Sequence, residues 1–271
     1  MSARSRIALA ALALVLILAP VAALHPVITH LYSAGFKSFP IEFTHPELLW
    51  LISIALAAVL PAGGFIAALV NAARATVHLR ALTRVSREAE LDGLHYRLLP
   101  IESVTVFTAG AFRPVTFVSS GAESALGDDR LRAALLHEAA HQRSKDVLWR
   151  LLLGAVGRGF AFVPWISGVV ESETLRTECA ADDYAIRAGA RRMDLFEAIV
   201  TASAAPPSPV RAGLSEANVE LRLRRLIHPG TPLPGRPTGS LVALIAAAAL
   251  PTLAAHLMAI AAAVGTSRLV V

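Results

Sequence analysis

Leu135-Leu136-His137-Glu138-Ala139-Ala140-His141 contains an H-E-x-x-H motif, inside a stretch that predicts a helix from Asp128 to about Lys145. Residues four apart stack on one face of an α-helix, so the two imidazoles can grip a single ion. Glu138 projects near that ion, where its carboxylate can take a proton from a metal-bound water. The motif therefore predicts a metal-dependent hydrolase with Glu138 as its general base.

The third metal ligand is expected on a second predicted helix, from Ser172 to about Ala188. A catalytic zinc site needs three protein ligands and an open position for water. Glu178 is the predicted third ligand for Zn2+, and Glu171, seven residues earlier on the same helix face, is the alternative. Asp182, one turn after Glu178, is expected to hold the free ring N–H of a ligand histidine and so fix its tautomer.

Cys179 is the only cysteine, so the chain can form no internal disulfide. Its neighbour Glu178 points about 100° away on the helix, which favours a small buried residue over a redox or ligand role. An oxyanion stabiliser is also expected for peptide hydrolysis. The sequence leaves its identity open among Arg222, Arg224, Arg225, His228 and Tyr184.

A small sheet is predicted before the motif. Three short runs are rich in β-branched and aromatic residues and are bracketed by Pro and Gly: Leu94–Leu99, Val104–Phe107 and Val115–Ser119. Val115–Ser119 could offer an edge strand along which an extended peptide pairs. Helices are expected over 71–91 and 215–227 in addition to the two above. The predicted fold class is therefore mainly α with a small β-sheet.

The chain of 271 residues is very apolar, with 55% hydrophobic and 17% charged residues and a mean hydropathy of +0.58. Three uncharged segments, each near the roughly 20 residues needed to cross a bilayer, explain this excess: 7–24, 48–70 and 241–264. We therefore expect an integral membrane protein, with 7–24 as a retained anchor rather than a cleaved signal peptide. The segment 147–170 is ambiguous, and the arginines within it favour a helix that lies under the membrane or packs on the domain over a fourth span.

Basic residues set the expected orientation. Arg4 and Arg6 precede the first span and four arginines follow the second, which places the N-terminus and everything after Val70 in the cytoplasm. The expected organisation is a membrane region over 1–70, a cytoplasmic metallopeptidase domain over 71–238 and a C-terminal span with a short tail over 239–271. The expected location is the cell inner (plasma) membrane, multi-pass. The net charge of +5 is attributed to membrane contact and not to nucleic acid, because no recognition motif accompanies it.

Three segments resemble BlaR/MecR-type membrane metallopeptidases. Phe107 to Val118 resembles the strand pair that precedes the motif in that family, and Leu135 to Asp146 is similar to its motif helix. Glu173 to Tyr184 is similar to its acidic, alanine-rich ligand helix. The resemblance covers about Asn71 to Ile227. It implies a gluzincin fold in which Glu138 is the general base and zinc is bound by His137, His141 and Glu178.

The resemblance also implies a function. In that family a cytoplasmic protease domain answers a signal by cleaving a transcriptional repressor, directly or indirectly. Because the chain ends just after the last predicted span, no penicillin-binding sensor domain is expected. The leading hypothesis is a membrane-anchored zinc endopeptidase that acts on a cytoplasmic protein, with the lipid bilayer as its other partner and a homodimer left open. An HtpX-like quality-control protease and a non-catalytic membrane receptor that keeps the fold are the alternatives.

Overall fold

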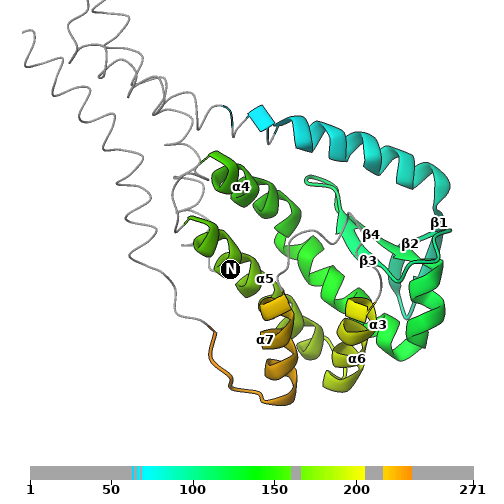
Figure 1. The fold of residues 1–271 in the computed structure, drawn as a ribbon. Helices are drawn as coiled ribbons and strands as arrows, with labels where there is room; N and C mark the ends of the chain where they lie inside the picture. Colours follow the sequence, from blue (N-terminus) through cyan, green and yellow to red (C-terminus); the bar gives the residue numbers. More distant parts are fainter. Residues whose placement is uncertain (1–62, 64–65, 68, 160–165, 205–215, 234–271) are drawn as a thin grey trace, which may run out of the picture. The chain divides into compact units, whose positions relative to one another are not determined.

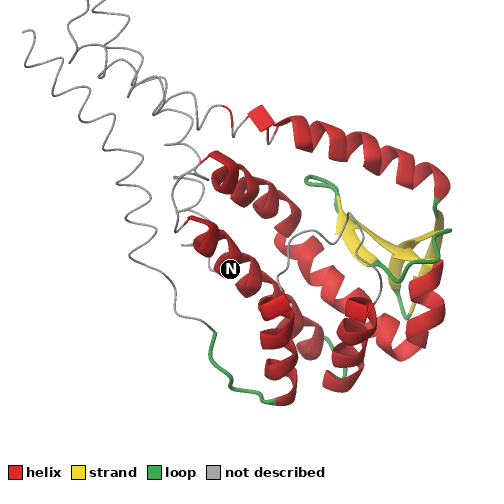
Figure 2. Ribbon diagram, viewed as in Figure 1, coloured by secondary structure: helices red, strands yellow, loops and turns green. Residues whose placement is uncertain are grey.

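The computed structural model describes residues 63, 66–67, 69–159, 166–204 and 216–233. The chain divides into two units, and the unit that holds the H-E-x-x-H motif comprises Leu69–Leu153 and Val170–Arg236. Its described part is mainly helical with one small four-stranded sheet (Figures 1 and 2). The predicted combination of helices with a small sheet is therefore confirmed.

The sheet has the strand order β1-β2-β4-β3, built from β1 (Arg87–Leu91), β2 (Leu94–Leu99), β3 (Val106–Ala109) and β4 (Val115–Ser119). β1 and β2 are antiparallel, β2 and β4 are parallel, and β3 and β4 are antiparallel. β4 is therefore an internal strand, and the expectation that Val115–Ser119 forms an edge is wrong. β3 is the outer strand on that side of the described sheet.

The predicted helix over 71–91 is too long, because residues 69–85 are helical and Arg87–Leu91 forms β1. The reason is the Asp92-Gly93 turn, in which both residues have positive φ, at 50° and 76°. Such a two-residue turn favours a tight antiparallel hairpin, and it pairs β1 with β2 from Leu91↔Leu94 outward. The side chain of Arg97 then contacts the end of the helix through Ser86 Oγ at 2.9 Å.

Five helices follow in the described part of the chain: α3 (Ser120–Ser144), α4 (Asp146–Gly159), α5 (Ile166–Arg187), α6 (Arg192–Ala204) and α7 (Glu216–Ile227). α3 is kinked at Gly127, whose φ of 65° and ψ of 174° are not helical. The straight part that carries the motif therefore starts at Asp128. It ends at Lys145, a left-handed residue with φ 54°, and α4 begins at the next residue.

The motif helix lies between two apolar clusters. One joins the sheet, α3 and α6 through Tyr96, Leu98, Val118, Ala122, Leu126, Leu131, Leu135 and Ala198. The other joins α3 to the helices that follow it through Ala133, Leu136, Ala185, Ala190, Leu195 and Leu226. Side chains buried on both sides hold α3 in a single position, as a catalytic or metal-binding helix requires.

Among the described residues, no helix has both the length and the apolar character required to cross a membrane. This finding corrects the expectation of an integral membrane protein and of a multi-pass location in the cell inner (plasma) membrane. In the ambiguous segment, α4 has 14 residues, about 21 Å of helix against the roughly 30 Å of a bilayer core, and it carries Arg150 and Arg158, so it is too short to be a fourth span. The segments 7–24, 48–70 and 241–264 lie outside the described residues, except for residues 63, 66, 67, 69 and 70.

Candidate metal centre

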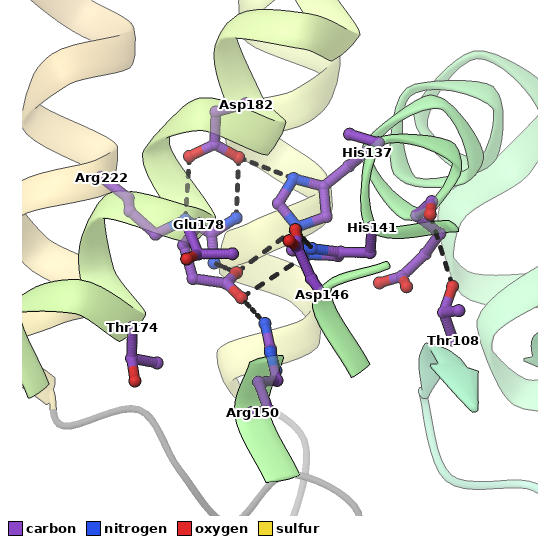
Figure 3. A network of polar contacts seen from close by, with 12 residues as sticks. Thr108, His137, His141, Asp146, Arg150, Thr174, Glu178, Asp182 and Arg222 are labelled. Atoms are coloured by element: carbon purple, nitrogen blue, oxygen red, sulfur yellow. Dashed lines mark hydrogen bonds and ion pairs between the residues drawn. The ribbon is translucent and has the colours of Figure 1, made fainter. Parts of the chain in front are cut away.

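Side chains from four helices meet at the motif (Figure 3). His137 and His141 come from α3 and are 7% and 5% exposed. The other helices contribute Asp146 and Arg150 from α4, Glu178 and Asp182 from α5, and Arg222 from α7. The structure thus brings together all of the residues predicted as metal ligands, although α3 and α5 are far apart in the sequence.

The two histidines and Glu178 face one another. The Nε2 atoms of His137 and His141 are 3.1 Å apart. Glu178 places Oε2 at 3.4 Å from Nε2 of His137 and Oε1 at 3.5 Å from Nε2 of His141. Two atoms bound at 2.0–2.1 Å to one tetrahedral zinc ion lie about 3.3 Å apart, so these separations suit a shared metal ion.

Glu138 completes a group that could hold a metal ion. Its carboxylate and the ring nitrogens of His137 and His141 lie within 4.8 Å of one another. The side chain is half-buried, whereas both histidines are buried. A carboxylate in this position can contact both a metal-bound water and the surrounding solvent.

Each histidine has a carboxylate beside its Nδ1 atom, on the side of the ring away from Nε2. Nδ1 of His141 donates to Asp146 Oδ2 at 3.0 Å. Nδ1 of His137 lies 2.8 Å from Asp182 Oδ1, although its N–H is not well aligned with the oxygen. A carboxylate is an acceptor only, so Nδ1 is the protonated nitrogen in both contacts. Both Nε2 lone pairs then point at the same place, an arrangement that repels unless a cation or proton lies between them.

Asp182 lies beside His137, as the sequence predicted. Asp146 was assigned no role in the sequence analysis. It follows His141 by five residues, a spacing that does not share a face on a continuous helix. The left-handed conformation of Lys145 ends α3 and turns the chain, which brings Asp146 back onto His141. A positive φ at a lysine has no sequence signal, and only the family-like segment ending at Asp146 could have drawn attention to this residue.

Two guanidinium groups hold the Glu178 carboxylate. Buried Arg222 contacts Glu178 Oε2 through Nη1 at 2.8 Å, and it donates from Nε and Nη2 to the two oxygens of Asp182 at 2.9 and 2.8 Å. Arg150, whose side chain is 45% exposed, contacts Glu178 Oε1 through Nη2. Sequence reasoning had considered Arg222 only as an oxyanion stabiliser and had missed this contact of Arg150.

These charges set the pKa values of the site. Burial alone would raise the pKa of Glu178, but Arg222, His137 and Arg150 outweigh it and hold this pKa well below its usual range. The pKa of Asp182 falls to about 2 although burial opposes the shift, because Arg222 and His137 stabilise the anion. Burial alone would lower the pKa of His137, but the Asp182 and Glu178 carboxylates raise it to about 9.

The other candidates have contacts elsewhere. Glu171 accepts a hydrogen bond from Asn218 at 3.4 Å, so the structure brings Glu178 and not Glu171 to the histidines. Arg224 pairs with Glu220 at 2.9 Å and Arg225 with Asp183 at 3.3 Å. The remaining oxyanion candidates, His228 and Tyr184, gain no contact that assigns them this role.

Cys179 is 1% exposed. Burial, with a further contribution from the Asp182 charge, raises the pKa of its thiol to about 11. A thiol that stays protonated is a poor metal ligand and a poor nucleophile. The structure therefore agrees with a small buried residue at this position.

No family model and no curated protein sequence matches the chain. The function is therefore inferred from the geometry of this site and from the sequence motifs.

Proposed function

We propose that the chain is a zinc-dependent endopeptidase that hydrolyses peptide bonds of a protein substrate. His137, His141 and Glu178 would hold the zinc ion, and Glu138 would act as general base. The observation that carries the proposal is the convergence of the two Nε2 atoms and the Glu178 carboxylate within 3.1 to 3.5 Å, with a carboxylate behind each imidazole.

The donor set and the charge both fit a divalent ion. Two histidines and one carboxylate are the ligands of zinc sites that keep an open position for water. Among the described side chains, the site contains four carboxylates (Glu138, Asp146, Glu178 and Asp182) and two guanidiniums (Arg150 and Arg222). With neutral imidazoles these groups carry a net charge of −2, which a divalent cation would neutralise.

Each side chain of the site would have its own role in the hydrolysis. When bound, zinc would lower the pKa of a water molecule towards about 7 and polarise the scissile carbonyl. Glu138 would accept the proton of the attacking water and deliver it to the leaving amine. Asp146 and Asp182 would keep each imidazole in the tautomer that presents Nε2. Arg222 would keep Glu178 ionised and fixed in place.

The position of β3 favours a peptide as the substrate. β3 is the outer strand of the described sheet, and an outer strand is where an extended peptide can pair with a sheet. Thr108 in the middle of β3 contacts the backbone carbonyl of Glu138 at 3.4 Å. A peptide added to β3 would therefore run past the general base.

The resemblance to BlaR/MecR-type metallopeptidases favours a regulatory role, such as cleavage of a transcriptional repressor, over HtpX-like quality control. A non-catalytic receptor that keeps the fold would need neither the base Glu138 nor its contact with an edge strand. We therefore propose that the chain cleaves its substrate as a step in signal transduction.

The experiment compares the wild-type full-length chain with Glu138→Gln. Zinc content is measured by plasma mass spectrometry, and cleavage of a peptide library is followed by mass spectrometry. We expect about one zinc ion per chain in both proteins and a loss of at least about a thousandfold in cleavage rate in the variant. Glu220→Gln, at an exposed pair on α7, is the matched control and should cleave normally. Equal cleavage by wild type and Glu138→Gln would refute the proposal.

A further inference from the structure

A chain of side-chain hydrogen bonds leaves the motif helix, crosses two strands and returns to the same helix. Gln142 Nε2 donates to Thr116 Oγ1 on β4 at 2.6 Å. Thr116 Oγ1 lies 3.0 Å from Thr108 Oγ1 on β3, and the two residues are direct partners in the β3–β4 pair. Thr108 Oγ1 donates to the backbone carbonyl of Glu138 at 3.4 Å.

The proton positions along this chain follow from its two ends. The Gln142 Nε2 group can only donate, and the Glu138 backbone carbonyl can only accept. Thr116 therefore accepts from Gln142 and donates to Thr108, and Thr108 donates to the carbonyl. Each hydroxyl gives one hydrogen bond and receives one. Thr116 is only 3% exposed, and hydrogen bonds arranged in one direction in a buried place strengthen one another.

Both ends of this series of hydrogen bonds lie on about one turn of α3, since Glu138 and Gln142 are four residues apart. Each follows a metal-binding histidine, His137 or His141, in the sequence. The middle of the chain is Thr108, on the outer strand of the sheet. The hydrogen bonds thus join the turn that carries the general base to the outer strand of the described sheet.

We propose that Gln142, Thr116 and Thr108 are positioning residues that hold β3 in a fixed register against the turn of Glu138. They thereby set which bond of a peptide paired on β3 reaches the general base. This inference rests on the proposed peptidase function. A purely structural role would predict a change in stability only, with the same bond cut at the same KM.

The test uses Thr108→Val, which keeps the shape of the side chain and removes the hydroxyl. The substrate is a peptide that the wild-type full-length chain cuts at one bond. We expect unchanged zinc content, a KM raised about tenfold with kcat within about threefold, and cleavage spread to neighbouring bonds. Thr108→Ser restores the hydroxyl and should restore the single cut. Hydrogen exchange of the β3 amides, which needs no activity, should be faster in Thr108→Val than in wild type.

Two further variants keep the test decisive. Thr105→Val is the matched control, because Thr105 lies just before β3 and contacts Ser119 through its backbone. Gln142→Met opens the other end of the chain and replaces Thr108→Val if that variant fails to fold. Wild-type KM, a single cut and unchanged β3 exchange in the variants would overturn this inference and leave the peptidase proposal standing. A zinc-loaded wild type that cuts no peptide would overturn the peptidase proposal itself, and this inference with it.

Discussion

The Nε2 atoms of His137 and His141 lie 3.1 Å apart, and each ring has a carboxylate at its Nδ1 atom. Two neutral imidazoles in this arrangement direct their lone pairs at one another. The Glu178 carboxylate adds negative charge at the same place. The arrangement is favourable when a metal cation or a proton lies between these groups.

Asp146→Asn and Asp182→Asn should each weaken zinc binding by about 10- to 100-fold. In the wild type, the carboxylate fixes the histidine tautomer and raises the basicity of Nε2. Each substitution removes this anion and so lowers the basicity of Nε2. Competition with a chromophoric chelator measures the affinity. Asp183→Asn is the control, since Asp183 pairs with Arg225 at 3.3 Å. Wild-type affinity in both variants would show that the carboxylates play no part in metal binding.

Arg222→Gln should destabilise the protein by about 3–5 kcal/mol, because it leaves Glu178 and Asp182 buried without their shared cation. Urea unfolding, followed by circular dichroism, measures this change. Arg224→Gln on the same helix is the control, and its exposed pair with Glu220 should contribute no more than about 1 kcal/mol. Equal effects of the two substitutions would contradict the role assigned to Arg222.

Arg150→Gln should strengthen zinc binding by about three- to tenfold. The Arg150 guanidinium contacts Glu178 Oε1, where it would compete with a bound metal ion and repel it. Arg222 stays in the variant and keeps Glu178 in place. Isothermal titration with zinc distinguishes the two arginines, because Arg222→Gln should weaken binding. Weaker binding in Arg150→Gln would mean that Arg150 mainly orients the ligand.

The apparent affinity for zinc should rise with pH by about tenfold per unit up to about pH 9. The metal needs a neutral imidazole, and the pKa of His137 is raised to about 9 in the absence of metal, so binding must release its proton at lower pH. Above this pKa the slope should flatten. The same shift makes His137 stabilise the metal-free protein below its ordinary pKa of about 6.5, and this contribution is lost as pH rises through 9. Chelator competition between pH 6.5 and 10 tests the slope, and a plateau already at pH 7 would contradict it.

Local patterns in the sequence predicted much of the fold and half of the site. Leu94–Leu99 and Val115–Ser119 form strands with the predicted bounds, because a short apolar run between turn residues is a local feature. The one-turn spacing of Glu178 and Asp182 predicts that they share a helix face, and both contact His137. β1 was missed because its charged residues suggested a helix, although Asp92-Gly93 was a readable hairpin signal.

The rest of the site depends on features that no local pattern encodes. Asp146 reaches His141 through the left-handed Lys145, and Arg222 reaches Glu178 from a helix about forty residues later, by tertiary packing. The membrane prediction was based on three uncharged segments of membrane-spanning length, and it is contradicted in the described part of the chain, where no helix combines the length and the apolar character that crossing a membrane requires. The composition gives the apolar content of a chain, but it does not show which structure the apolar residues adopt.

We propose that His137, His141 and Glu178 hold one zinc ion. Anomalous diffraction from zinc-loaded crystals, recorded on both sides of the zinc absorption edge, would locate this ion. We expect one peak about 2.0–2.2 Å from both Nε2 atoms and from a Glu178 oxygen, with Glu138 outside bonding distance. A peak elsewhere, or none between the two histidines, would contradict it.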